Sequence, residues 1–141
     1  MGLILKEPVD KEFQGIVEYI HVFDLDNRDL DPKQFIAAFL NNQLVGFARL
    51  REHAGFMELC SLGVVTSYRR KGVGKAIVEE LIKSSKKNIY LVCIIPDYFN
   101  PFGFNIVNEF PISMQHKIDY CTKHLVVPQN YLVMFMDKQL P

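Results

Sequence analysis

The order and spacing of the apolar segments predict an α+β fold. Three apolar runs, over residues 35–40, 44–51 and 56–65, follow one another with short polar or glycine-containing turns between them. Such runs are typical of consecutive antiparallel strands. A long amphipathic helix follows only after the third run, whereas doubly wound nucleotide-binding folds alternate strands with helices. We therefore expect a mixed α/β structure with a mostly antiparallel sheet of about six or seven strands and about four helices.

The segments before these runs predict a strand, a helix and a loop. Leu3–Leu5 is a short apolar run that Pro8 ends, and Asp10 is suited to cap a helix. The apolar stripe of that helix comprises Phe13, Ile16, Val17 and Ile20. Residues 24–33 are acidic, but they lack the glycine and the final glutamate of a calcium loop, so we favour a surface loop.

The second half of the chain predicts alternating helices and strands. The helix after Gly74 places Val73, Ile77 and Leu81 on one face, as expected for packing on a sheet. Residues 89–95 are apolar without interruption, which predicts a strand buried on both faces. Beyond Pro96 the patterns predict a helix over 98–102, a short run over 105–108, a helix over 112–124 and a strand over 131–137.

The composition is that of one domain, residues 1–141, without a strong overall charge. Lys plus Arg and Asp plus Glu number 16 each, so no global field attracts nucleic acid or an anionic membrane. The three cysteines fit reduced residues, and the Cys and His spacing shows no metal-binding pattern. No run approaches the roughly 18 apolar residues of a membrane span, and the first residues resemble no signal peptide. We expect a cytoplasmic protein that binds no metal, nucleic acid or membrane.

The segment from Arg69 to Lys75 (R-R-K-G-V-G-K) has the character of an anion-binding turn. Gly72 and Gly74 let the backbone approach a ligand closely and take dihedrals that side chains disfavour. The helix that begins there presents N–H groups without internal partners at the positive end of its dipole. With three basic residues just before Gly72, the turn predicts a diphosphate site. A tight turn with solvated charges is the alternative.

Two well-known phosphate loops do not fit this turn. The dinucleotide fingerprint G-x-G-x-x-G would need glycine at Ile77, and the P-loop would need glycine at Arg69 and Ser or Thr at Ala76. What remains is R-x-x-G-x-G, from Arg69 to Gly74, after a strand that carries Glu58. This pattern resembles the acetyl-CoA signature of the GNAT superfamily of N-acetyltransferases.

The resemblance extends beyond the turn. Against the histone-acetyltransferase branch it runs without a gap from Phe56 to Gly74, and Tyr98 to Phe104 (Y-F-N-P-F-G-F) is similar to the family's F-Y-x-x-x-G-F segment. It implies the GNAT fold, in which the strands over 56–65 and 89–95 splay into a V-shaped cleft and the loop over 24–33 covers the acceptor. It also implies acetyl-CoA as cosubstrate.

The resemblance implies where the cosubstrate lies. Pantetheine would run along the strand edge near Leu62 to Val65, with an N–H near Leu62 facing the thioester oxygen. The residues that we expect to contact acetyl-CoA are Leu62, Gly63, Val64, Val65, Arg69, Arg70, Lys71, Gly72, Val73, Gly74, Lys75, Phe99 and Phe102.

Glu58 matches the general base of the histone-acetyltransferase branch. Period-two alternation would place it on one face of its strand with Cys60, Leu62 and Val64. Apolar neighbours would partly desolvate it and raise its pKa toward the range of a working base. The alternative is a glutamate on the exposed face of an amphipathic strand, with deprotonation through water.

The leaving-group position departs from the family pattern. The family commonly supplies a tyrosine to protonate the departing thiolate, but the matching residue is Phe99, and Tyr98 lies one residue earlier. Phenylalanine there, and loosely the tail of the chain, resemble the N-acetylglutamate-synthase-like branch. Tyr98 is our candidate acid, although water is also able to complete the step.

We therefore expect an N-acetyltransferase that transfers acetyl from acetyl-CoA directly to a primary amine, such as that of an amino acid or another small metabolite. A protein lysine or an N-terminal amine is an alternative acceptor. A CoA-binding or interaction module that keeps the fold but has little turnover is the alternative function. Both a monomer and a homodimer remain open.

Overall fold

The computed structural model describes residues 2–139, which divide into two compact units. The first unit contains the chain up to Arg51 and Leu59–Ser84, and the second contains Glu52–Glu58 and the residues from Ser85 onward. The expectation of a single domain over residues 1–141 stays a prediction. In the part that is described, every helix is too short or too polar to cross a bilayer.

The strands form a seven-stranded mixed sheet, as expected from the sequence. They are β1 (Ile4–Lys6), β2 (Phe35–Leu40), β3 (Gln43–His53), β4 (Phe56–Val64), β5 (Ile89–Cys93), β6 (Asn105–Ile106) and β7 (Leu132–Met136), in the order β1-β2-β3-β4-β5-β7-β6. The pairs β1 with β2, β2 with β3, β5 with β7 and β6 with β7 are antiparallel. β4 and β5 pair in parallel near their first residues, Met57 with Ile89 and Glu58 with Tyr90. The splay beyond that point stays a prediction.

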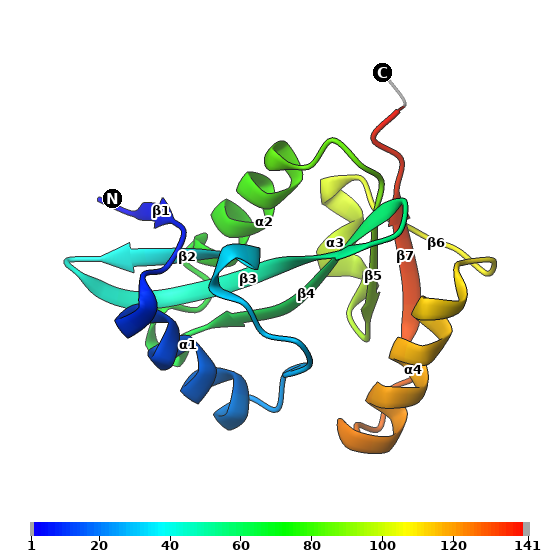
Figure 1. Cartoon of the computed structure of the whole chain (residues 1–141), viewed down its shortest axis with the longest axis horizontal. Helices are drawn as coiled ribbons and strands as arrows, with labels where there is room; N and C mark the ends of the chain where they lie inside the picture. Colours follow the sequence, from blue (N-terminus) through cyan, green and yellow to red (C-terminus); the bar gives the residue numbers. More distant parts are fainter. Residues whose placement is uncertain (1, 140–141) are drawn as a thin grey trace. The chain divides into compact units, whose positions relative to one another are not determined.

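The first unit packs a helix on each face of its strands. Helix α1 (Asp10–Val22) lies on one side of β2 and β3, and α2 (Val73–Ser84) on the other (Figure 1). The core on the α1 side comprises Ile16, Ile20, Phe35, Ala37, Phe39 and Phe47. On the other side, a Cβ at Gly46 would meet Ile77 and Val73 of α2 at 2.9 Å. Gly46 therefore allows α2 to approach the sheet closely.

Local turn chemistry confirms most of the expected boundaries. Asn41 and Asn42, between β2 and β3, have positive φ values of 50° and 64°, which asparagine tolerates better than most residues. The expected cap was one residue off: Asp10 is the first residue of α1 and Val9 is its N-cap, whose N–H donates to the Glu12 carboxylate.

In the second unit, helix α4 (Ile112–His124) packs on β5. The short helix α3 (Pro96–Phe99) and a 3-10 turn, Asn100–Phe102, follow β5 along the chain. The bounds expected for α4 are confirmed. Met114 of α4 forms a cluster with Phe56 and Val133, and Tyr90 and Val92 pack against it. The prediction that β5 is buried on both faces is confirmed in part, because Ile89, Leu91 and Cys93 are buried whereas Tyr90 and Val92 are half-buried.

Candidate functional site

The expected anion-binding turn contains two residues with left-handed backbone conformations. Arg70 and Gly72 both have left-handed φ values, 63° and 83°, and α2 begins at the next residue, Val73. Gly72 thus takes the conformation predicted for it. For Gly74 the prediction was wrong, because this residue lies in the first turn of α2 and Arg70 takes the second left-handed position instead.

The start of α2 presents donors and positive charge together. Ala76 N–H donates to the Gly72 carbonyl at 3.1 Å, the bond that opens the helix. A helix leaves the N–H groups before that bond, here those of residues 73–75, without internal partners. Lys71 and Lys75 are both exposed beside these groups. Charge and donors thus coincide, as an anionic ligand requires.

Arg69, unlike Lys71 and Lys75, is bonded to the backbone of the strand that precedes the turn. Its Nε donates to the Val64 carbonyl at 2.9 Å, and its guanidinium lies over the Phe23 ring, 5.1 Å from the centroid. These contacts fasten the turn to the end of β4. They favour a role for Arg69 in holding the loop.

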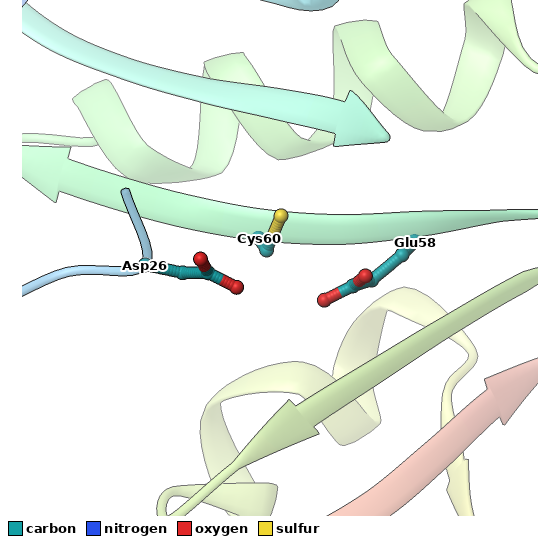
Figure 2. Close-up of side chains that lie close together, drawn as sticks. All are labelled: Asp26, Glu58 and Cys60. Atoms are coloured by element: carbon teal, nitrogen blue, oxygen red, sulfur yellow. The ribbon is translucent and has the colours of Figure 1, made fainter. Parts of the chain in front are cut away.

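β4 contains an irregularity at Ser61, which has a φ of 55° inside the strand. Cys60 and Ser61 are adjacent, yet both reach Asp26: Cys60 Sγ lies within 4.8 Å of its carboxylate, and Ser61 Oγ donates to its carbonyl at 2.8 Å. Figure 2 shows the Asp26 and Cys60 side chains close together at β4, with Glu58 two residues before Cys60. We call this irregularity the Ser61 bulge, because two consecutive residues occupy one face.

The Ser61 bulge reverses the alternation of the residues that follow it. A Cβ at Gly63 would meet the Phe47 ring at 2.6 Å, so residue 63 faces the α1 side of the first unit. Leu62 and Val64 consequently face the opposite side. The prediction that they share a face with Glu58 and Cys60 was therefore wrong beyond Cys60, because the sequence pattern does not reveal a bulge.

The backbone direction at Leu62 follows from the same register. Val65 N–H donates to the Val45 carbonyl of β3 at 2.9 Å, whereas the Val64 carbonyl accepts from Arg69. Backbone groups of alternate residues point to opposite edges of a strand. The N–H groups of Leu62 and Val64 therefore point away from β3, toward the other edge of β4.

A buried arginine, which sequence reasoning did not identify, supports the Ser61 bulge. Arg49 is 0% exposed; its Nε donates to Ser61 Oγ at 2.9 Å, and its charge faces the Asp26 carboxylate at 3.6 Å. One signal was available in the sequence. Arg49 has the same alternation parity in β3 as Phe47, an inward position, and an arginine there requires buried partners.

The second unit contains Glu58, which is 1% exposed. Its Oε1 lies 2.8 Å from His53 Nε2, and its Oε2 lies 3.0 Å from Lys117 Nζ. The alternative of an exposed-face glutamate was therefore wrong. The buried carboxylate thus has a cationic partner in Lys117, as a buried charge requires. The ring of His53 stacks on Phe56 at 4.7 Å.

Lys117 and His53 are further residues that sequence reasoning missed. Lys117 is buried on α4, and it interrupts the stripe of Met114 and Cys121 at helical spacing. A lysine within such a stripe is a usable signal for a buried anionic partner. His53 offers no comparable signal, since it lies at the end of a long strand.

The aromatic segment after β5 also belongs to the second unit. Phe99 is buried and packs edge-on against Phe104, whereas Tyr98 is 37% exposed and contacts the rings of Phe99 and Phe102. Partial burial raises the pKa of the Tyr98 phenol above its ordinary value. The hydroxyl is therefore protonated at neutral pH, as a proton donor must be.

The predicted residues are thus distributed over both units. The expected phosphate and pantetheine contacts, from Leu62 to Lys75, lie in the first unit, and Glu58, Tyr98, Phe99 and Phe102 lie in the second.

Solved structures with the same fold include several that contain CoA. The N-acetylglutamate synthase of Neisseria gonorrhoeae, complexed with coenzyme A and N-acetyl-glutamate, is 13% identical with a TM-score of 0.76 over 99% of this chain. The chain covers 36% of that synthase, about a third of its length. Rv2747 of Mycobacterium tuberculosis, in complex with CoA and NLQ, is 13% identical with a TM-score of 0.78, covering 95% of this chain and 98% of the other.

A third structure, from Arabidopsis thaliana, contains the bisubstrate analogue CoA-Ac-MVNAL. It is 20% identical with a TM-score of 0.67, and the match covers 97% of this chain and 99% of the other. At these identities the likeness shows the fold. The family itself is shown by a sequence model, described as the acetyltransferase (GNAT) family, that matches residues 6–99. The R-x-x-G-x-G turn and this match agree, and the chain belongs to the GNAT family of acyl-CoA N-acyltransferases.

Proposed function

We propose that the protein transfers an acetyl group from acetyl-CoA to a primary amine, and that the turn from Arg70 to Lys75 binds the diphosphate of CoA. The observation that carries the proposal is the pair of left-handed residues, Arg70 and Gly72, directly before α2. This backbone directs N–H groups outward at the positive end of a helix, between exposed lysines. Several solved proteins with this fold contain CoA, which supports the same cosubstrate here.

The thioester carbonyl is polarised by a backbone donor in this proposal. The amine nitrogen attacks the carbonyl carbon, the C–S bond breaks and an amide bond forms, while negative charge develops on the oxygen. The Leu62 N–H, directed away from β3 by the Ser61 bulge, supplies the hydrogen bond to that oxygen. Rigid backbone donors are an effective way to stabilise such charge because they need no reorganisation during the reaction.

Glu58 accepts the proton of the amine in this proposal. Its burial and its pairing with Lys117 and His53 hold the carboxylate in one orientation, and a buried carboxylate able to exchange a proton suits a general base. The size of the task depends on the acceptor. At pH 7, deprotonation costs about 1.4 kcal/mol for an α-amine and about 4.6 kcal/mol for a lysine amine. A modest base therefore suffices for an amino acid.

An amino acid or another small amine is the acceptor that we favour, with a peptide amine as the second candidate. The name of the synthase and its bound N-acetyl-glutamate support the former, and the peptide-like analogue in the Arabidopsis structure supports the latter. Tyr98 remains the candidate acid for the thiolate. Contacts of acetyl-CoA with Phe99 and Phe102, a cytoplasmic location, the lack of a metal, and a monomeric or homodimeric state stay predictions.

Release of free thiol from acetyl-CoA, measured with a panel of amino acids, polyamines and peptides, tests the proposal. We expect release to depend on one class of acceptor and the acetylated amine to appear in equal amount. CoA binding without acceptor-dependent release would instead identify a CoA-binding or interaction module. Failure to bind acetyl-CoA in calorimetric titration would refute the assignment of the turn.

A further inference from the structure

Arg49 connects three segments of the first unit through one guanidinium group. Its Nε donates to Ser61 Oγ in β4 at 2.9 Å, and its Nη1 donates to the Arg28 carbonyl at 2.9 Å and to Gln34 Oε1 at 3.0 Å. Arg28 and Gln34 belong to the segment 26–34, which precedes β2. The planar fork of an arginine is able to make such divergent hydrogen bonds, whereas the compact ammonium of a lysine is not.

Asp26 completes this arrangement from the segment 26–34. Its carboxylate accepts two hydrogen bonds from the Arg28 side chain, at 3.1 and 2.9 Å, and its carbonyl accepts from Ser61 Oγ at 2.8 Å. Asp26 and Arg49 are both buried. Because buried charges are costly unless they are paired and hydrogen-bonded, removal of either one disturbs the whole set.

The Ser61 bulge depends on these bonds. A left-handed conformation is unfavourable for any residue other than glycine, and such a residue persists only where its surroundings hold it. The Ser61 hydroxyl accepts from Arg49 and donates to Asp26, so both of its bonds lead into the same cluster. Without them, we expect β4 to relax toward regular alternation, which would turn the Leu62 N–H toward the opposite edge.

We propose that Arg49 is a positioning residue for acyl transfer, which ties the segment 26–34 to the Ser61 bulge and thereby aims the Leu62 N–H at the thioester. This inference rests on the proposed acetyl transfer. It adds that a residue without contact to either substrate sets the direction of the donor. It also links that donor to the loop for which we expect a role next to the acceptor.

The test compares Arg49→Lys, Ser61→Ala and Ser61→Gly with the matched control Arg51→Lys. Arg51 lies two residues further along β3 and pairs with the exposed Asp29 of the same segment, so Arg51→Lys tests whether an exposed ion pair to this segment has the same effect. The measurements are kcat, KM for the amine, calorimetric Kd for acetyl-CoA, Tm, and the carbonyl stretching frequency of bound acetyl-CoA by isotope-edited infrared spectroscopy. The last measurement reports the hydrogen bond directly and needs no turnover.

We expect Arg49→Lys and Ser61→Ala to lower kcat by about tenfold or more, with Kd for acetyl-CoA within about threefold of wild type, because a misdirected donor affects the transition state more than binding. The carbonyl band should move toward that of free acetyl-CoA. Ser61→Gly also lacks the hydroxyl, so it should lower kcat too, but less than Ser61→Ala, because glycine adopts the left-handed φ without strain. Arg51→Lys should match wild type.

An unchanged carbonyl band in Ser61→Ala would overturn the role of Arg49. So would losses of kcat that merely follow the folded fraction. If Arg49→Lys does not fold, the two Ser61 variants decide the question. A wild-type protein that binds acetyl-CoA with a shifted carbonyl band but acetylates no amine would refute the proposed transfer and leave the infrared comparison valid. A wild type that does not bind acetyl-CoA would overturn both proposals.

Discussion

Each unit of the molecule buries an ionic cluster, and the two clusters differ in what their charges are able to do. The cluster of the first unit is built on Arg49, and arginine side chains stay protonated in proteins. Its partners include Asp26 and the Ser61 hydroxyl. The cluster of the second unit consists of Glu58, Lys117 and His53, and carboxylate, amine and imidazole groups are those that proteins use for acid–base catalysis.

This difference separates two tasks. An arginine that donates to neutral acceptors, here a hydroxyl, a backbone carbonyl and an amide oxygen, is suited to hold segments in place, and these hydrogen bonds should change little with pH. Titratable groups at hydrogen-bond distance are suited to exchange protons, and their effect should change with pH. We therefore expect substitutions in the first unit to change affinity or geometry at all pH values, and substitutions around Glu58 to change rates in a pH-dependent way.

The largest expected effect is on stability, in the second unit. Lys117→Met should lower the free energy of unfolding by about 3–5 kcal/mol, because Glu58 would lose a buried ion-pair partner. Denaturant unfolding monitored by circular dichroism measures this change. The double variant Glu58→Gln/Lys117→Met should recover part of the loss, since no buried carboxylate remains to be compensated. A loss below about 1 kcal/mol would show that the pair is not coupled.

The next effect concerns affinity in the first unit. Gly74→Asp should abolish acetyl-CoA binding, because it places a negative charge in the first turn of α2, where the diphosphate is expected to bind. Calorimetric titration at several pH values should give the same loss throughout. Gly74→Ala adds a side chain without a charge and should weaken acetyl-CoA binding less. Arg69→Ala should also weaken it less, because the Arg69 side chain is bonded to the Val64 carbonyl. Unchanged affinity of the folded Gly74→Asp variant for acetyl-CoA would show that the diphosphate does not bind at this turn.

The pH-dependent effect is expected at Glu58. Glu58→Gln should lower kcat/KM by about 10²-fold or more at neutral pH, in line with the contribution of a general base. The loss should shrink as pH rises, because more of the amine is then already deprotonated. Glu52→Gln, an exposed glutamate in the same unit, is the control. A loss that is the same at every pH, or smaller than threefold, would give Glu58 a structural role only.

The smallest effect is expected at the leaving group. A thiol of ordinary pKa departs as its anion at pH 7 at a cost of only about 2 kcal/mol, so an acid is helpful but dispensable. Tyr98→Phe should therefore change kcat by less than about fivefold. Phe99→Tyr should leave kcat unchanged or raise it by up to about tenfold. A hundredfold loss in Tyr98→Phe with unchanged Kd for acetyl-CoA would identify Tyr98 as the required acid.

The sequence by itself was enough for the elements and the family. Apolar periodicity, asparagine and glycine turns and the R-x-x-G-x-G pattern are local signals, because each arises from residues a few positions apart. The bounds of β2 and α4 and the left-handed Gly72 follow from such signals. The same signals misplaced the second left-handed residue of the turn, which is Arg70 and not Gly74. A glycine is able to adopt a left-handed conformation, but its presence does not require one.

Only the tertiary structure decided which polar residues meet. Arg49 and Ser61 are 12 residues apart, Asp26 and Ser61 are 35 apart, and Lys117 reaches Glu58 from another element. The sequence pattern indicates that a charged residue is buried, but it does not indicate which partner residue neutralises that charge. The Ser61 bulge has the same origin, since an extended strand is the local preference and long-range hydrogen bonds override it. The face of Leu62 and the partners of Glu58 were therefore decided by contacts that the order of residues does not encode locally.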